Sequence, residues 1–232
     1  MSPAPPALLA RETGAQYTHA RRSGCRAMVL RNPFITVIVT GVPGVGKTTV
    51  LGRVAEKLRS KGVRFEIVNF GDYMFREASA AGLVRHRDEM RHLPLRRQLE
   101  LQESAARAII ADASSKLGGD GVLLVDTHAV IRTSTGFWPG LPENVVRELK
   151  PDSIVLIEAP PEIIVARQQR DKSRVRSDVA SVETVRELLE MARKAAMASA
   201  VLVAASVYPV ENVEGNPDIA AEKIVELIEK LR

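Results

Sequence analysis

The residues best suited to chemistry begin at Gly41, where the sequence GVPGVGKT follows a short apolar run. Gly41, Gly46, Lys47 and Thr48 occupy the defined positions of the phosphate-binding loop pattern. Glycines let the backbone N–H groups of such a loop point inward at anionic oxygens, and the helix that follows adds a favourable dipole. The pattern therefore predicts that this loop binds the phosphates of a nucleotide.

Each position of the loop has an expected task. Lys47 is expected to bridge the β- and γ-phosphates of ATP, Thr48 to ligate Mg²⁺, and Thr49 to reach the α-phosphate. The dinucleotide-binding fingerprint is a poor alternative, because no third glycine follows Gly46 at the required spacing. The residues expected to hold the ATP phosphates are Gly41, Val42, Pro43, Gly44, Val45, Gly46, Lys47, Thr48 and Thr49.

A second acidic position separates the classes of protein that share this loop. Asp126 ends the apolar segment VLLVD, where a carboxylate can hold Mg²⁺ through water. The next residue is Thr127, whereas mechanical ATPases usually have there a glutamate that polarises water. The chain also contains no Asn-Lys-x-Asp guanine motif. A kinase with a phosphate acceptor fits better, since its nucleophile is already an anion and it requires cations instead of a base.

Arginines lie near the expected ends of the strands. The segment HRDEMR carries two of them, and another follows Asp126 by six positions. In ARQQRDKSRVR, three arginines recur at spacings of three and four, which places them on one face of a helix. Guanidinium groups bind phosphates through paired hydrogen bonds, so this set predicts contacts to phosphate. The candidates are Arg87, Arg91, Arg132, Arg167, Arg170, Arg174 and Arg176.

From residue 34 onward, apolar runs rich in β-branched residues alternate with helical patterns. Such runs are typical of strands buried on both faces, and their alternation with helices predicts a parallel sheet. We therefore expect an α/β fold, a doubly wound five-stranded parallel sheet with helices on both faces. The expected strands are Ile35–Thr40, Phe65–Asn69, Val122–Asp126, Ser153–Glu158 and Val207–Val210. The expected helices are Lys47–Lys61, two short ones within Tyr73–His92, Leu95–Lys116, Pro161–Lys172, Val182–Ala204 and Pro217–Leu231.

Seven stretches, in order along the chain, resemble the archaeal type of adenylate kinase. They are GVPGVGKTTV, NFGDYM, RDEMR, DTHAVIRT, PGLP, RQQRD and NVEGNPDIAA, and the resemblance runs from about Val37 to the C-terminus. It implies a nucleoside monophosphate kinase domain over residues 34–232, with a small AMP-binding segment at about 71–94 and a short lid at about 170–181. It also implies the reaction MgATP + AMP ⇌ 2 ADP, with ATP and Mg²⁺ bound, a homotrimer, and no structural zinc.

The resemblance further implies roles for individual residues. It places Arg167 against the adenine or ribose of ATP, and the backbone of Asn212 and Val213 at the adenine edge. It assigns Mg²⁺ to Thr48 and Asp126. Around AMP it places Gly71, Asp72, Arg87, Arg91 and Arg132. His128 is a further candidate for AMP binding, although a histidine just past a buried strand is more often a structural residue. Catalysis of the transfer is assigned to Lys47, Arg132, Arg167, Arg170, Arg174 and Arg176. The chain departs from other adenylate kinases in one motif, since DTHAVIRT stands where a shorter DGFPRT stretch brings the arginine closer to the aspartate.

Composition sets the remaining expectations. Of the 232 residues, 45% are apolar and 26% charged, as in an ordinary soluble domain. The single cysteine and the lack of a long apolar run favour a cytoplasmic protein without a membrane span. The net charge of +5 comes mainly from five arginines in residues 1–33, which predicts a disordered basic extension. Met28 lies close to the first strand and is a second candidate for the start of translation.

Three alternatives stay open at this point. A P-loop ATPase linked to RNA or ribosome assembly would use residues 1–33 as a basic arm, the one route by which we expect nucleic acid to bind. A nucleotide sensor would bind ATP and AMP without forming ADP. A different nucleoside monophosphate kinase, acting on CMP or UMP, would share the same motifs, because acceptor preference rests on backbone contacts and pocket shape.

Overall fold

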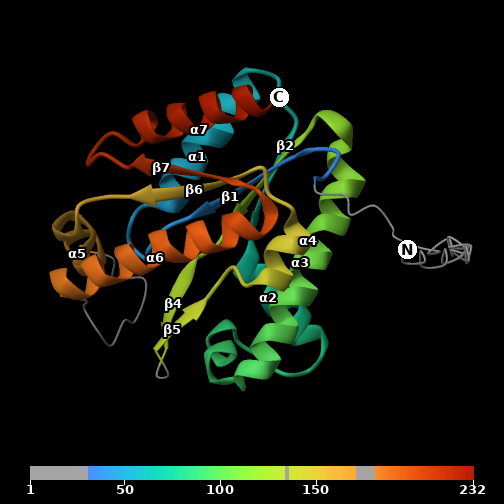
Figure 1. Cartoon of the computed structure of the whole chain (residues 1–232), viewed down its shortest axis with the longest axis vertical. Helices are drawn as coiled ribbons and strands as arrows, with labels where there is room; N and C mark the ends of the chain where they lie inside the picture. Colours follow the sequence, from blue (N-terminus) through green and yellow to red (C-terminus); the bar gives the residue numbers. More distant parts are fainter. Residues whose placement is uncertain (1–30, 134–135, 171–180) are drawn as a thin grey trace, which may run out of the picture.

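The computed structural model describes residues 31–133, 136–170 and 181–232 of the chain. At its centre is a five-stranded sheet in the order β2-β3-β1-β6-β7 (Figure 1). All neighbouring strands are parallel, so their carboxyl ends share one edge of the sheet. The predicted fold class is confirmed. The strands are β1 (Ile35–Thr40), β2 (Phe65–Asn69), β3 (Val122–Asp126), β6 (Ser153–Glu158) and β7 (Ser206–Glu211).

Helices cover both faces of the sheet (Figure 1). Alternation within β1 explains the two layers, because Val37 and Val39 belong to one apolar cluster and Ile38 to the other. All three side chains are fully buried. None of the helices within the described ranges is long and apolar enough to cross a membrane. The first cluster takes in α1 (Lys47–Ser60) and α7 (Pro217–Leu231), and the second takes in α3 (Leu95–Leu117) and α4 (Glu143–Leu149). The helix α6 (Val182–Val203) contributes buried residues to both clusters.

Shorter elements gather where the strands end. A β-hairpin follows β3, and Figure 1 shows it projecting away from the sheet; its first strand contacts α6. The segment after β2 forms one α-helix and one 3-10 helix, and the segment after β6 forms a single helix. These elements are β4 (Val130–Thr133), β5 (Gly136–Pro139), α2 (Phe70–Ala80), η1 (Arg87–His92) and α5 (Pro161–Arg170), and a further 3-10 turn, η2 (Gly118–Asp120), follows α3.

The structure departs from the sequence prediction mainly in these short elements. The hairpin and α4 were not predicted, because strands of four residues and a helix of seven are too short to show a period. Arg132, six positions beyond the end of the third predicted strand, lies within β4. The first of the two predicted short helices begins at Phe70, three residues early, because the Asn69 side chain caps it by accepting a 3.2 Å hydrogen bond from the Asp72 N–H.

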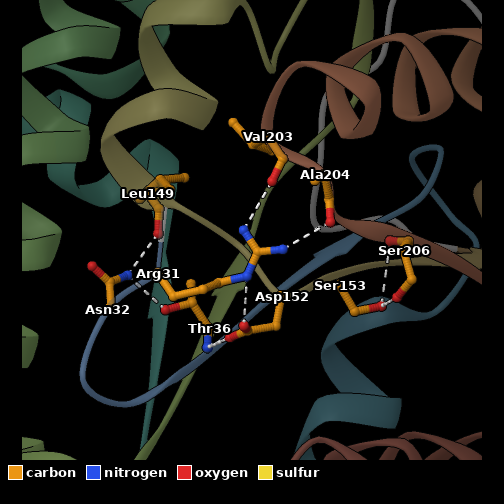
Figure 2. Close-up of polar contacts among 9 residues, drawn as sticks. All are labelled: Arg31, Asn32, Thr36, Leu149, Asp152, Ser153, Val203, Ala204 and Ser206. Carbon is orange, nitrogen blue, oxygen red and sulfur yellow. Dashed lines mark hydrogen bonds and ion pairs between the residues drawn. The ribbon is translucent and has the colours of Figure 1, made fainter. Parts of the chain in front are cut away.

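At the opposite, amino edge of the sheet, two residues ahead of β1 tie separate elements together (Figure 2). The Arg31 guanidinium donates hydrogen bonds of 2.8 and 2.7 Å to the carbonyls of Val203 and Ala204, where α6 ends, and it pairs with Asp152 at 2.9 Å. The Asn32 amide donates to the Leu149 carbonyl, at the end of α4, at 2.8 Å. Ordered contacts therefore begin before residue 34, the predicted start of the domain; residues 1–30 of the predicted extension lie outside the described part.

Replacing Arg31 by Ala is expected to lower the free energy of unfolding by about 1–3 kcal/mol, because the α6 carbonyls and the Asp152 carboxylate lose a charged donor. Arg53→Ala serves as the control, since it removes an exposed ion pair with Glu56 and should change the free energy of unfolding very little. Urea unfolding of the two variants makes the comparison. An equally small loss of unfolding free energy in both variants would show that the Arg31 contacts stabilise the fold no more than an exposed ion pair does.

Candidate active site

The phosphate-binding loop leaves the carboxyl end of β1 and enters α1, at the sheet edge where ligands of such folds bind. Gly46 has φ of +93°, a left-handed conformation that favours glycine, and it forms the N-cap of α1. Gly41 lies so close to β6 that a Cβ there would be 2.6 Å from the Ile157 carbonyl oxygen. The loop therefore has the backbone freedom and close packing that a phosphate cradle requires.

Some of the other loop residues are buried in the core, and others are exposed to solvent. Val42 and Val45 are buried in the apolar cluster that also contains α1, so they fix the loop to the core. The Pro43 carbonyl accepts a 2.6 Å hydrogen bond from the Gln168 side chain of α5. Thr48 and Thr49, in the first turn of α1, are exposed and can reach a ligand.

Lys47, the first residue of α1, folds back over its own loop. It is only 9% exposed, and its Nζ donates a 3.1 Å hydrogen bond to the Gly41 carbonyl. The same Nζ lies 3.3 Å from Nδ1 of His128 and 4.0 Å from an Asp126 carboxylate oxygen. Nδ1 of His128 is also 2.9 Å from the Gly41 carbonyl. His128, predicted near AMP, is thus placed against the phosphate-binding loop.

Asp126 is linked to the predicted AMP-binding segment through the side chain of Asn69. The two residues are register partners at the ends of β3 and β2, so their side chains leave the sheet side by side. The Asn69 amide donates a 3.0 Å hydrogen bond to an Asp126 oxygen. Its carbonyl oxygen accepts a 2.9 Å hydrogen bond from Arg87, which also pairs with Asp72. A continuous set of contacts therefore runs from Lys47 to the predicted AMP segment.

Arg87 also explains the glycine before Asp72. A Cβ on Gly71 would collide with the Arg87 guanidinium, so the missing side chain lets Arg87 cross this turn. Arg91 lies in η1, but its side chain is outside the described part of the structure. Arg132 is exposed on β4, where its register partner is Phe137 of β5. The described contacts thus join Gly71, Asp72 and Arg87, and leave Arg132 on the hairpin.

On the other side of the loop, Arg167 and Asn212 converge on one carbonyl. Arg167, with its side chain 19% exposed, donates to the Val45 carbonyl at 2.9 Å, and the Asn212 amide donates to the same atom at 2.8 Å. Asn212 is 4% exposed, whereas Val213 beside it is 38% exposed. The residues predicted at the adenine end of ATP are therefore attached to the loop predicted to hold its phosphates.

Glu214 balances the arginines of α5. Its carboxylate accepts hydrogen bonds of 2.8 Å from Arg167 and 3.2 Å from Arg170. The hydrogen bond from Arg167, followed by that from Arg170, lowers the pKa of Glu214 below its ordinary value. At neutral pH the carboxylate is therefore charged and holds both guanidinium groups. Arg174, Arg176 and most of the predicted lid lie outside the described residues.

Sequence reasoning missed three residues that this geometry makes prominent, namely Asn69, Gln168 and Glu214. Asn69 had a detectable signal, because a polar residue ends an apolar strand just before the Gly71–Asp72 pair. Gln168 and Glu214 gave none, since their partners, Pro43 and the two α5 arginines, are distant in the sequence.

The oxygen donors of this edge suit a hard cation. The Thr48 hydroxyl and the Asp126 carboxylate are of the type that Mg²⁺ prefers, and both lie beside Lys47 at the loop. Within the described ranges, no group of three or more His, Cys, Asp or Glu side chains is arranged to hold a metal ion by itself. The protein oxygens therefore fit a magnesium ion that shares its coordination with nucleotide phosphates and water.

Comparison with known proteins decides the family. A family model described as "AAA domain" matches residues 40–186. The chain is 54% identical over 188 residues to the adenylate kinase of Sulfurisphaera tokodaii, an alignment that covers 81% of this chain and 96% of the relative. It is 41% identical over 192 residues to the adenylate kinase of Methanocaldococcus jannaschii, covering 83% and 97%. The chain belongs to the adenylate kinase family. As an adenylate kinase it is a nucleoside monophosphate kinase.

A solved structure supports the fold of this adenylate kinase independently. The chain superposes on a shikimate kinase from Acinetobacter baumannii, solved in complex with shikimate, with a TM-score of 0.51. The two share 17% identity, and the match covers 86% of this chain and 95% of the other. At that identity the likeness establishes a shared fold and nothing about the acceptor.

Proposed function

We propose that this adenylate kinase transfers the γ-phosphoryl group of ATP to AMP in a Mg²⁺-dependent reaction that gives two molecules of ADP. The observation that carries the proposal is the contact set from Lys47 through Asp126 and Asn69 to Arg87. It joins a loop suited to a triphosphate with a second cationic position suited to a monophosphate. One phosphate site would serve an ATPase; two sites joined in this way serve transfer between nucleotides.

The phosphate-binding loop and Lys47 form the donor side of the proposed reaction. Backbone N–H groups of the loop and of the first turn of α1 bind the β- and γ-phosphates, and Lys47 turns from the Gly41 carbonyl to them. An oxygen of the AMP phosphate forms a bond to the γ-phosphorus while the bond to the bridging oxygen breaks, and ADP leaves with the electron pair. Lys47 stabilises the charge that develops on the transferred group.

No protein base is required, because the attacking phosphate oxygen is already an anion at neutral pH. Thr48 and Asp126 would hold Mg²⁺, which when bound supplies further charge neutralisation on the β- and γ-phosphates. Catalysis by the chain itself then consists of positioning and electrostatic stabilisation. This division agrees with Thr127, rather than a glutamate, following Asp126.

Arginines complete both halves of the proposed site. Arg87, Arg91 and Arg132 are proposed to bind the AMP phosphate, and the position of Arg87 over Gly71 and beside Asp72 supports its part in this. Arg167 lies against the loop and Asn212, where the base and ribose of ATP would bind. Arg170, with Arg174 and Arg176 from the lid, is proposed to reach the transferring group. For Arg167 and Arg170 this means exchanging part of their contact with Glu214 for phosphate.

A coupled assay of ADP formation tests the acceptor. With ATP and Mg²⁺ held constant, AMP is expected to give the highest kcat/KM among AMP, CMP, UMP, GMP and dAMP. A higher value for CMP or UMP would replace AMP by that acceptor and leave the kinase assignment standing. ATP hydrolysis that is insensitive to every monophosphate would overturn the proposed reaction.

We also propose a homotrimer. Support comes from α6, where Met197, Val201 and Leu202 remain 54%, 73% and 40% exposed in the single chain. Exposed apolar clusters of this kind mark contact surfaces between proteins. Light scattering should give three times the chain mass of 25.3 kDa, and Val201→Glu should lower that mass. A monomer at micromolar concentration would contradict the proposal.

A further inference from the structure

Asn69 lies between the ATP side and the AMP side of the proposed site and belongs to neither side alone. It is both the last residue of β2 and the N-cap of α2. The parallel register of β2 and β3 makes Asp126 its direct neighbour at the carboxyl edge of the sheet. One amide therefore lies at the junction between the strand that carries the magnesium carboxylate and the helix that opens the AMP segment.

The amide is saturated in one orientation. Nδ2 donates to the Asp126 carboxylate at 3.0 Å, while Oδ1 accepts from Arg87 at 2.9 Å and from the Asp72 N–H at 3.2 Å. Two acceptances use both lone pairs of Oδ1. The reversed amide would set its NH₂ group against two donors and its oxygen against a carboxylate. The neighbours therefore fix the direction of this side chain, and the side chain in turn constrains them.

The two ends of the amide face the two nucleotides. Asp126 lies 4.0 Å from Nζ of Lys47 on the donor side. Arg87, paired with Asp72 and crossing over Gly71, lies on the acceptor side. A displacement of Arg87 by an incoming phosphate must move or release Oδ1, and a displacement of Asp126 by an incoming metal ion must do the same to Nδ2.

We propose that Asn69 is a positioning residue that couples the two half-sites, so that MgATP and AMP each strengthen the binding of the other. The inference rests on the proposed function, since it requires a donor and an acceptor nucleotide. Coupling of this kind is reciprocal, because it is a difference in free energy between states of one molecule. Asn69 touches neither reacting atom; it acts through Arg87 and Asp126.

The competing explanation is that Asn69 only caps α2. Two variants that keep a capping oxygen but break the link from Arg87 to Asp126 distinguish the two roles. Asn69→Ser keeps an oxygen that can cap Asp72, but a hydroxyl is too short to span from Arg87 to Asp126. Asn69→Asp keeps acceptors for Asp72 and Arg87, and replaces the donor to Asp126 by a like charge. Both should fold. Arg31→Ala is the matched control, because it weakens the fold at the opposite edge of the sheet.

The experiment measures AMP binding to the full chain by calorimetry, with and without a saturating, non-hydrolysable MgATP analogue. In the wild type, the analogue is expected to tighten AMP binding about fivefold or more, the usual lower range for coupled sites. In both Asn69 variants this ratio should approach one, whereas Arg31→Ala should keep the wild-type ratio despite a lower Tm.

Three results would overturn the inference. The first is that the analogue does not change AMP binding to the wild type. The second is that both Asn69 variants keep the wild-type ratio. The third is that Arg31→Ala loses the ratio in proportion to its fall in Tm. The proposed function fails separately, if the wild type forms no ADP from ATP and AMP. An active wild type whose Asn69 variants stay coupled would remove only the role of Asn69.

Discussion

Replacing Lys47 by Met is expected to lower kcat/KM for ADP formation by about 10³-fold or more, which corresponds to about 4 kcal/mol of transition-state stabilisation. Met keeps the unbranched stem that is buried against the loop but removes the charge. The ammonium group is held 3.1 Å from the Gly41 carbonyl oxygen and 4.0 Å from an Asp126 oxygen, so it lies at the loop from which it turns to the phosphates. The coupled assay with ATP, AMP and Mg²⁺ measures the effect.

The control for this variant is Lys61→Met, at the other end of α1. Lys61 is exposed and pairs with Glu229 at 2.8 Å, far along the helix from the loop. It should retain wild-type turnover. Circular dichroism of Lys47→Met should match that of the wild type, because the substitution leaves the buried volume nearly unchanged. Wild-type turnover in Lys47→Met would refute the role given to this lysine.

Gly46→Ala is expected to damage both stability and catalysis. At φ of +93° an L-residue costs about 1–2 kcal/mol, and the new Cβ would lie 2.5 Å from the Asn212 amide nitrogen. Relief of that contact must shift the loop or the Asn212 amide that binds Val45. Because a 1 Å displacement of positioned groups can reduce a rate about 10²-fold, we expect a loss of that order in kcat/KM for ATP.

A second glycine of the same helix supplies the matched control. Gly52 lies in the middle of α1 on its exposed side, and a Cβ there would have no other atom within 4 Å. Gly52→Ala should therefore raise the free energy of unfolding by about 0.5–1 kcal/mol and leave kcat/KM unchanged. Thermal unfolding and the coupled assay on both variants separate the two effects. A Gly46→Ala enzyme as active as Gly52→Ala would show that the loop conformation is not required.

The elements that carry long periodic or apolar patterns were predictable from the sequence. The strands from Ile35 to Thr40 and from Val122 to Asp126 are buried on both faces, so each is a mainly apolar run, without a polar alternate face, that depends little on context. The hairpin around Arg132 is different. Its two four-residue strands are stabilised by pairing with each other, which a local pattern does not reveal. For this reason the sequence indicates only that Arg132 follows Asp126 by six positions, and not that it lies in a strand.

The site was predictable as a set of residue types but not as a set of contacts. The loop motif assigns Lys47 to phosphate wherever it occurs, because the chemistry is local. The contact of Asn69 with Asp126 depends on the order β2-β3-β1 and on the register of one strand pair. Likewise, Glu214 reaches Arg167 only because β7 lies beside β6, which brings the segment after β7 close to α5. Such contacts follow from topology, which the sequence patterns left open.

The contacts of Arg31 and Asn32 define how far the gene can be shortened at its 5′ end. A product that starts at Met28 retains both residues and with them the links to the ends of α6 and α4. A product that starts at Phe34 loses those links, although it still contains every strand and helix of the described fold. The useful limit for trimming therefore falls between residues 28 and 31, ahead of the first strand by several residues.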